Sequence, residues 1–116
     1  MTDRELLELA AKAAGLSAEW VDFAGMDIRV GYQGGMLCAD GDSDYYWNPL
    51  KSDGDALRLA VKLRIQITPG TYNEYEATAF RAGAAEAHEK ATMGYGIEAA
   101  TRRAIVRAAA EIGKSM

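Results

Sequence analysis

Several residue types that support chemistry are scarce in this chain of 116 residues. Its one cysteine, Cys38, excludes an internal disulfide and a cysteine-based zinc site, and it indicates a reducing compartment. Its one histidine, His88, lacks the partners that a metal site or a histidine-based catalytic triad requires, so we interpret it as a surface residue. No apolar run approaches the ~18 residues of a membrane span. The sequence therefore predicts a soluble, intracellular protein.

An excess of basic residues is also missing. The chain has 13 Lys and Arg residues against 17 Asp and Glu residues, which gives a formal net charge of −4. This balance disfavours general nucleic-acid binding, because such proteins present a basic face to phosphates. A local basic pocket stays compatible with it. Hydrophobic residues make up 49% of the chain, enough for a packed core, and we expect residues 1–116 to form a single domain.

Helical spacing of apolar residues predicts three helices. A capping box at Thr2 and Glu5 opens the first, and Ser52 or Asp53 caps the second. Apolar residues cover most of the circumference of the second helix, so we expect Leu57 in the core. Glycines end the first and third helices. The expected helices span residues 2–14, 52–63 and 97–112, with Ile105 of the third in the core and Gly15 and Gly113 as the two stops.

Alternating polar and apolar residues predict strands between the helices. The alternation is clearest over residues 26–32, where Gly34 and Gly35 follow as a tight hairpin turn. The fold class is therefore α+β, in the order α-β-β-α-β-β-α. We expect a layered sandwich in which a mostly antiparallel four- to five-stranded sheet is covered by helices. The expected strands are 18–23, 26–32, 36–39, 45–47, 64–68, 72–81 and 85–92.

An acidic loop precedes the strand expected at residues 45–47. Asp40, Asp42 and Asp44 have the alternate-position spacing of a calcium loop. The sixth position of that motif is Tyr45 instead of Gly, and the twelfth is Lys51 instead of Glu. We interpret the segment as a solvated acidic turn.

Three arginines of the last helix have two interpretations. Arg103 and Arg107 lie four residues apart, so they place like charges on one helix face, which costs stability unless an anion or acidic partner lies between them. Arg102 adds a third cation. Glu98 and Glu111 lie within reach on the same helix and favour a solvated, neutralised face. The alternative is contact with an anion or ligand.

A run of three aromatic residues is equally open to two interpretations. Alternation sends Tyr46 to one face of a strand and Tyr45 and Trp47 to the other, so all three cannot be core residues. Exposed aromatic side chains form interfaces or stack on nucleobases. Next to them, Asn48 can read a base edge or ribose, and Asp53 can bind a ribose hydroxyl or simply cap the helix.

Parts of the chain resemble a known family. The segments 47–50 (WNPL), 53–63 (DGDALRLAVKL) and 100–110 (ATRRAIVRAAA), with the N-terminal helix, are similar to small phage and prophage proteins that have a phage ABA-sandwich domain, relatives of the NinX-like group. The resemblance implies a phage accessory protein in the host cytoplasm with a layered α/β sandwich. It implies no catalytic residues, metal or cofactor.

Small acidic phage accessory proteins often counteract host defence, and two hypotheses follow. In the first, the protein sequesters a nucleotide-derived immune signal without turnover. In the second, it is a direct protein-binding inhibitor of a host defence complex, as anti-CRISPR proteins are, and its acidic surface meets a basic groove. The ligand-binding residues of the first hypothesis are Tyr45, Trp47, Asn48, Asp53, Arg102, Arg103 and Arg107.

The sequence also suggests expectations about catalysis and about oligomeric state. No nucleophile–base pair or metal-ligand set is recognisable in the sequence, which favours binding over an enzymatic reaction. Exposed aromatics and five methionines favour burial between subunits, so we expect a homo-oligomer with no membrane contact and no general nucleic-acid binding.

Overall fold

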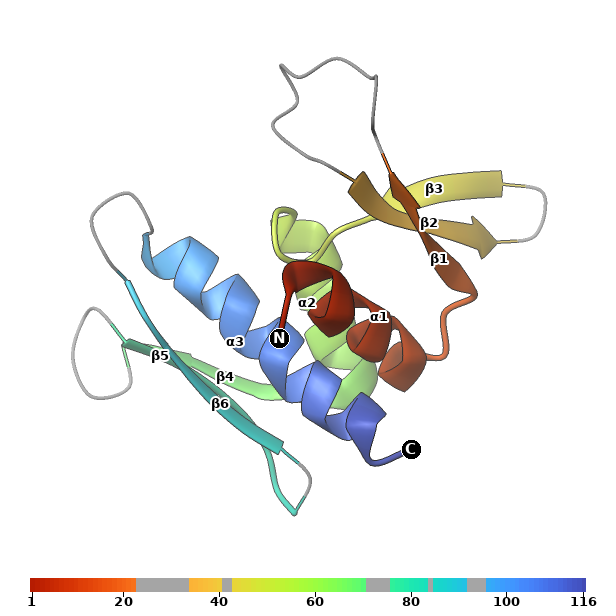
Figure 1. The fold of residues 1–116 in the computed structure, drawn as a ribbon. Helices are drawn as coiled ribbons and strands as arrows, with labels where there is room; N and C mark the ends of the chain where they lie inside the picture. Colours follow the sequence, from red (N-terminus) through yellow and green to blue (C-terminus); the bar gives the residue numbers. More distant parts are fainter. Residues whose placement is uncertain (23–33, 41–42, 71–75, 84, 92–95) are drawn as a thin grey trace.

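In the described part of the chain, three helices lie between two small antiparallel sheets (Figure 1). The computed structural model describes residues 1–22, 34–40, 43–70, 76–83, 85–91 and 96–116. Sheet A has the strand order β1-β2-β3, and sheet B the order β4-β5-β6. The elements are α1 (Asp3–Ala14), β1 (Ala18–Asp22), β2 (Gly34–Asp40), β3 (Ser43–Trp47), α2 (Asp53–Leu63), β4 (Gln66–Pro69), β5 (Glu76–Arg81), β6 (Ala85–Lys90) and α3 (Ile97–Lys114).

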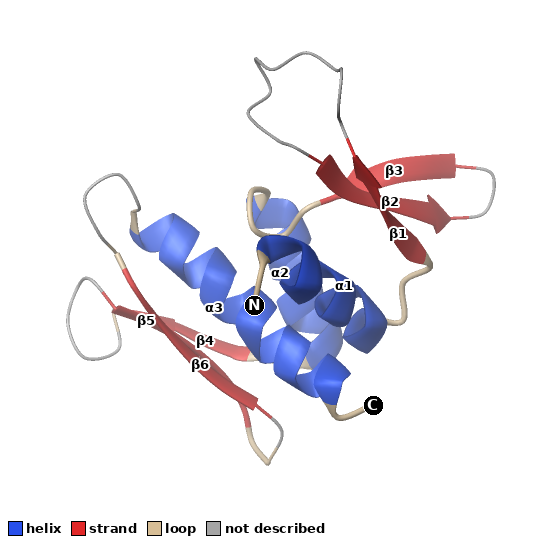
Figure 2. Ribbon diagram, viewed as in Figure 1, coloured by secondary structure: helices blue, strands red, loops and turns tan. Residues whose placement is uncertain are grey.

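The α+β class agrees with the sequence-based prediction, and so does the alternation of helices with antiparallel strands, although three described strands, instead of two, lie between each pair of helices. The strands differ from it in forming two three-stranded sheets instead of one sheet of four to five strands. Helix α2 separates the two sheets along the chain, and among the described residues each sheet pairs strands that follow one another in the order β1-β2-β3 or β4-β5-β6. As a result the helices form a central layer between the sheets (Figure 2).

A predicted turn is instead part of a strand. Gly34 and Gly35 open β2 and pair with Asp22 and Val21 of β1, while the other side of β2 pairs with β3. The predicted strand 26–32 lies outside the described residues. Pro69 ends β4, an edge strand, where a residue without an N–H group is tolerated.

The predicted helix caps are present. Thr2 accepts a hydrogen bond from the Glu5 amide, and Ser52 accepts one from the Asp55 amide, each at 3.2 Å. Gly15 ends α1 in the left-handed conformation, at φ 70°. Gly113 was predicted to end the last helix and does not, since α3 continues to Lys114.

The reason for Gly113 lies in the crossing of α1 and α3. A Cβ atom at this buried position would lie 2.2 Å from the carbonyl oxygen of Leu9 in α1. The glycine therefore permits the two helix backbones to approach closely. Helix α3 packs on sheet B with one side and on α1 and α2 with others, so it lies at the centre of the fold (Figure 1).

The core confirms one predicted helix phase and corrects another. Ile105 of α3 is buried, as predicted. Leu57 of α2 was predicted to be a core residue, but its side chain is 59% exposed. Apolar residues occur on most sides of α2, so their periodicity did not show which side faces the core. Packing on α3 buries the side of α2 that lies away from Leu57. The buried residues of α2 are Ala56, Leu59, Ala60 and Leu63. No helix in the described part of the chain is both long enough and apolar enough to cross a membrane.

Candidate functional site

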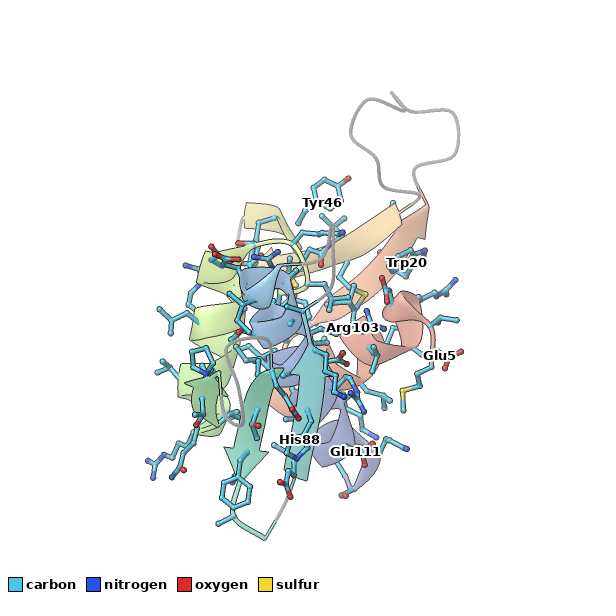
Figure 3. All side chains as sticks on the ribbon, turned by 90° about the vertical axis from the view of Figure 1, so that its left-hand side faces the viewer. Glu5, Trp20, Tyr46, His88, Arg103 and Glu111 are labelled. Carbon is cyan, nitrogen blue, oxygen red and sulfur yellow. The ribbon has the colours of Figure 1, made fainter. Side chains whose placement is uncertain are left out.

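The aromatic run divides between the core and the surface. Trp47 is only 4% exposed and pairs with Met36 on the inner face of sheet A. Tyr46 pairs with Leu37 and is 55% exposed, so it lies on the outer face, as alternation predicted. Figure 3 shows it projecting at the end of the molecule opposite His88. Tyr45 is 39% exposed at the edge of the sheet. A base could therefore reach Tyr45 and Tyr46, whereas the Trp47 ring is covered.

Cys38 lies beside these aromatics and is buried on the inner face of sheet A. Burial raises the pKa of its thiol, because the thiolate would lose hydration. A side-chain hydrogen bond with Tyr45 lowers the pKa, and the charge of Asp55 raises it. The thiol is consequently held in its protonated, unreactive form, in keeping with a structural role.

Asn48 organises the turn that leads from sheet A into α2. Its side-chain oxygen accepts a hydrogen bond from the Leu50 amide at 3.1 Å, and its own amide donates to Asp55 Oδ2 at 3.0 Å. Its carbonyl also accepts hydrogen bonds from the amides of Lys51 and Ser52. These contacts explain the Asn-Pro sequence as a turn and helix entry.

Arg102 links this turn to α3. Its Nε donates to the carbonyl oxygen of Leu50 at 3.0 Å, and its Nη1 donates to Asp53 Oδ1 at 2.5 Å. Three of the residues predicted as one ligand site, Asn48, Asp53 and Arg102, thus belong to connected segments. The structure brings them together through contacts within the fold.

Arg103 and Arg107 lie on a different side of α3. Arg107 Nη1 contacts Glu89 Oε1 at 2.7 Å and the carbonyl oxygen of His88 at 2.9 Å. Arg103 contacts Asp3 Oδ1 at 2.9 Å, and its Nε lies 3.7 Å from the same Glu89 oxygen. The acidic partner that the two like charges require therefore comes from β6, a source that helical spacing could not reveal.

His88 lies on the outer face of sheet B among polar side chains. Its Nε2 lies 2.9 Å from Glu86 Oε1, and its Nδ1 lies 3.2 Å from Thr78 Oγ1 and 3.7 Å from Glu76 Oε1. Its position agrees with the interpretation as a surface residue. Within the described ranges, no three His, Cys, Asp or Glu side chains are grouped as metal ligands.

A surface that sequence reasoning missed lies over α2. Leu57 and Val61 are 59% and 68% exposed and follow one another at four-residue spacing, so they share one outer face of the helix. Beside Leu57 an open groove of about 290 Å³ runs between α2, β4 and α3. We call Leu57, Val61 and this groove the α2 face. The groove is lined by Asp53, Ala56, Leu57, Ile67, Pro69, Ile97, Glu98, Thr101, Arg102 and Ile105.

Charge changes sign along the α2 face. The end near the start of α2 carries the exposed carboxylates of Asp53 and Glu98. The other end carries the exposed Arg64. Apolar residues all around α2 were the sequence signal for this face, since such a helix is either fully buried or covered by a partner.

Two parts of the sequence-based prediction stay untested by these contacts. The expected acidic turn over residues 40–44 is in part strand, because Asp40 ends β2 and Asp44 lies in β3; the side chains of Asp40, Asp42 and Asp44 lie outside the described residues. The chain matches no protein-family model, and no curated protein or solved structure matches it. The resemblance to phage ABA-sandwich proteins therefore stays a prediction.

Proposed function

We propose that the protein acts by binding another polypeptide at the α2 face, without turnover. The observation that carries the proposal is the exposure of Leu57 and Val61 next to an apolar groove. Contiguous apolar surface of this kind marks interaction sites on proteins that are otherwise well packed. The face combines an apolar centre with charged ends, which is the usual anatomy of a protein–protein interface.

The groove fits a side chain better than a nucleotide. Ile67, Pro69, Ile97 and Ile105 line it from β4 and α3, and polar groups lie at its rim. Complete burial of an aliphatic side chain contributes about 1.5–3 kcal/mol, so a partner that covers Leu57 and inserts one side chain gains several such contributions. The charged rim would then orient the partner more than it would add affinity.

Sequestration of a nucleotide-derived signal receives less support from the same contacts. Arg102, Arg103 and Arg107 are each engaged by a carboxylate of the protein, so a phosphate would compete with Asp53, Asp3 and Glu89 for these arginines. Removing one partner from such a pair leaves the remaining charge without its contact, at a cost that binding must offset. The exposed rings of Tyr45 and Tyr46 are what favours base stacking.

The biological setting of the proposal comes from the sequence resemblance. A phage accessory protein that binds polypeptides without turnover would counteract host defence as a direct inhibitor of a defence protein. This role rests on the similarity of the WNPL, α2 and α3 segments to phage proteins. The α2 face supports polypeptide binding alone and does not identify that polypeptide as the defence protein; if a second copy of the chain covers α2, the defence protein binds the assembled dimer elsewhere.

Site-specific photocrosslinking tests the proposal. A photoreactive amino acid replaces Leu57 in one variant and Phe80, on the outer face of sheet B, in a matched control, since both side chains are exposed apolar groups. After irradiation in cells, we expect crosslinked polypeptide at position 57 in clear excess over position 80. Equal yields at the two positions, or no polypeptide product at position 57, would contradict the proposal.

A second experiment distinguishes nucleotide sequestration from polypeptide binding. Purified parent protein is denatured, and the released small molecules are analysed by mass spectrometry. A nucleotide released by the parent but not by Tyr45→Ala or Arg103→Ala variants would establish signal sequestration in place of polypeptide binding.

A further inference from the structure

The α2 face has the charge pattern of a surface that is complementary to itself. Asp53, Leu57 and Val61 lie four residues apart along one side of α2, and Arg64 follows at the end of the helix. Along this stripe the order is acidic, apolar, apolar, basic. Reversing the direction of the stripe exchanges its acidic and basic ends. Two copies that meet head to tail therefore place opposite charges together at both ends.

The side chains at the two ends are accessible for such a contact. The carboxylate of Asp53 is 80% exposed although it contacts Arg102. Arg58 folds back toward the start of the helix, where it contacts Asp55 Oδ1 at 2.7 Å. The basic end of the stripe is thus formed by Arg64, which is exposed.

We propose that the polypeptide bound at the α2 face is a second copy of this chain, in a twofold dimer whose α2 helices lie antiparallel. This rests on the proposed function, because it names the partner of the same face. Leu57 of one copy faces Val61 of the other, and the acidic start of α2 faces the basic end of the partner helix. The contact is isologous, so each favourable pair occurs twice, and the two helix dipoles are antiparallel.

Other modes of pairing around this face are less favourable. Parallel α2 helices would bring Asp53 next to its own copy and Arg64 next to its own copy, which is repulsive at both ends. Addition of a strand to the β4 edge of sheet B, which borders this face, would meet Pro69, which offers no N–H group for a ladder. Side-chain packing through α2 avoids both difficulties.

Light scattering on the full chain tests the assembly. We expect a mass twice the chain mass of 12.5 kDa at micromolar concentration. Leu57→Asp should shift the dissociation constant by at least two orders of magnitude toward monomer, while Phe80→Asp, which alters an exposed apolar residue elsewhere, should leave the dimer intact. Because Leu57 is exposed, its variant should keep the melting temperature and circular dichroism of a folded monomer.

Disulfide trapping tests the orientation. Chains with Leu57→Cys and chains with Val61→Cys are oxidised separately and as a mixture. A disulfide requires Cβ atoms about 3.5–4.5 Å apart, whereas antiparallel helices centred between these positions offset each residue from its own copy by about 6 Å along the axis. We expect the mixed 57–61 product to exceed each homodimer product several-fold. The parent, whose Cys38 is buried, is the control for background oxidation.

The outcomes distinguish this inference from the proposed function. A parent that stays monomeric while position 57 crosslinks to a foreign polypeptide would overturn the dimer and leave polypeptide binding in place. A monomer with no crosslinked polypeptide would overturn both. A dimer that survives Leu57→Asp, or that forms mainly 57–57 disulfides, would overturn the antiparallel α2 contact.

Discussion

The two sheets pack on the helices with side chains of different size. Sheet A presents Trp47, Met36 and Cys38 on its inner face, and all three are buried. Sheet B presents alanines at the corresponding positions of its inner face, at Ala79 and Ala87. One sheet therefore fills its interface with large side chains, and the other fills it by close approach of the helix.

Helix α3 is built for this close approach. Its buried positions are mostly small residues, so its backbone can lie near sheet B on one side and near α1 on another. Interiors reach similar density by either route, because a void is costly wherever it occurs. The comparison predicts opposite sensitivities: sheet A should be sensitive to loss of volume, and sheet B to gain of volume. The buried small residues of α3 are Ala100, Ala104, Ala108, Ala109, Ala110 and Gly113.

The largest effect should follow truncation of sheet A. Trp47→Ala removes a buried ring and leaves a cavity, which typically costs about 3–5 kcal/mol. The free energy of unfolding, measured by urea denaturation, should fall by that amount. Tyr46→Ala on the outer face of the same strand is the matched control and should change it by less than about 1 kcal/mol. Similar losses for both variants would show that the sheet does not pack on the helices as described.

A smaller loss should follow overpacking of sheet B. Ala79 is fully buried beneath α3, and Ala79→Leu forces extra methyl groups into a close-packed interface, at a cost of about 1–3 kcal/mol. Phe80→Leu, on the outer face one residue along, is the control and should be nearly neutral. Urea denaturation measures both variants. If Ala79→Leu were as stable as the parent, the proximity of α3 and sheet B would be disproved.

The smallest effect concerns the Cys38 thiol, which reports on sheet A alone. Burial raises its pKa in the folded protein, so at mildly alkaline pH the thiol ionises in the unfolded chain before it ionises in the folded one. The folded state then binds more protons, and stability should fall as pH rises through the ordinary thiol range. Alkylation should be slow in the folded protein and fast in denaturant.

Alkylation also sharpens the comparison between the sheets. Trp47→Ala should accelerate the reaction of Cys38, because Trp47 covers the same inner face of sheet A. A destabilised sheet B, as in Ala79→Leu, should accelerate it only if the two sheets open together. Equal acceleration by both variants at equal loss of stability would show that the sheets unfold as one cooperative unit.

Much of the candidate site could be predicted from the sequence, but its key feature, the exposure of Leu57, could not. The turn at Asn48, the cap at Ser52 and the proximity of Asp53 to Arg102 concern residues in the blocks that the sequence reading singled out. The exposure of Leu57 was predicted wrongly. Periodicity shows that a helix side is apolar, but it does not show whether another element covers that side.

By itself the sequence determined the features that depend on near neighbours. Thr2 and Ser52 cap helices because the amides they accept from lie three residues away, and Tyr46 points away from Trp47 because strand side chains alternate. Only the tertiary structure decided that the strands form two sheets, that Glu89 lies between Arg103 and Arg107, and that one apolar side of α2 is left uncovered. Each of these depends on segments far apart in the chain, whose meeting is set by the sum of many weak packing contacts and not by any local pattern.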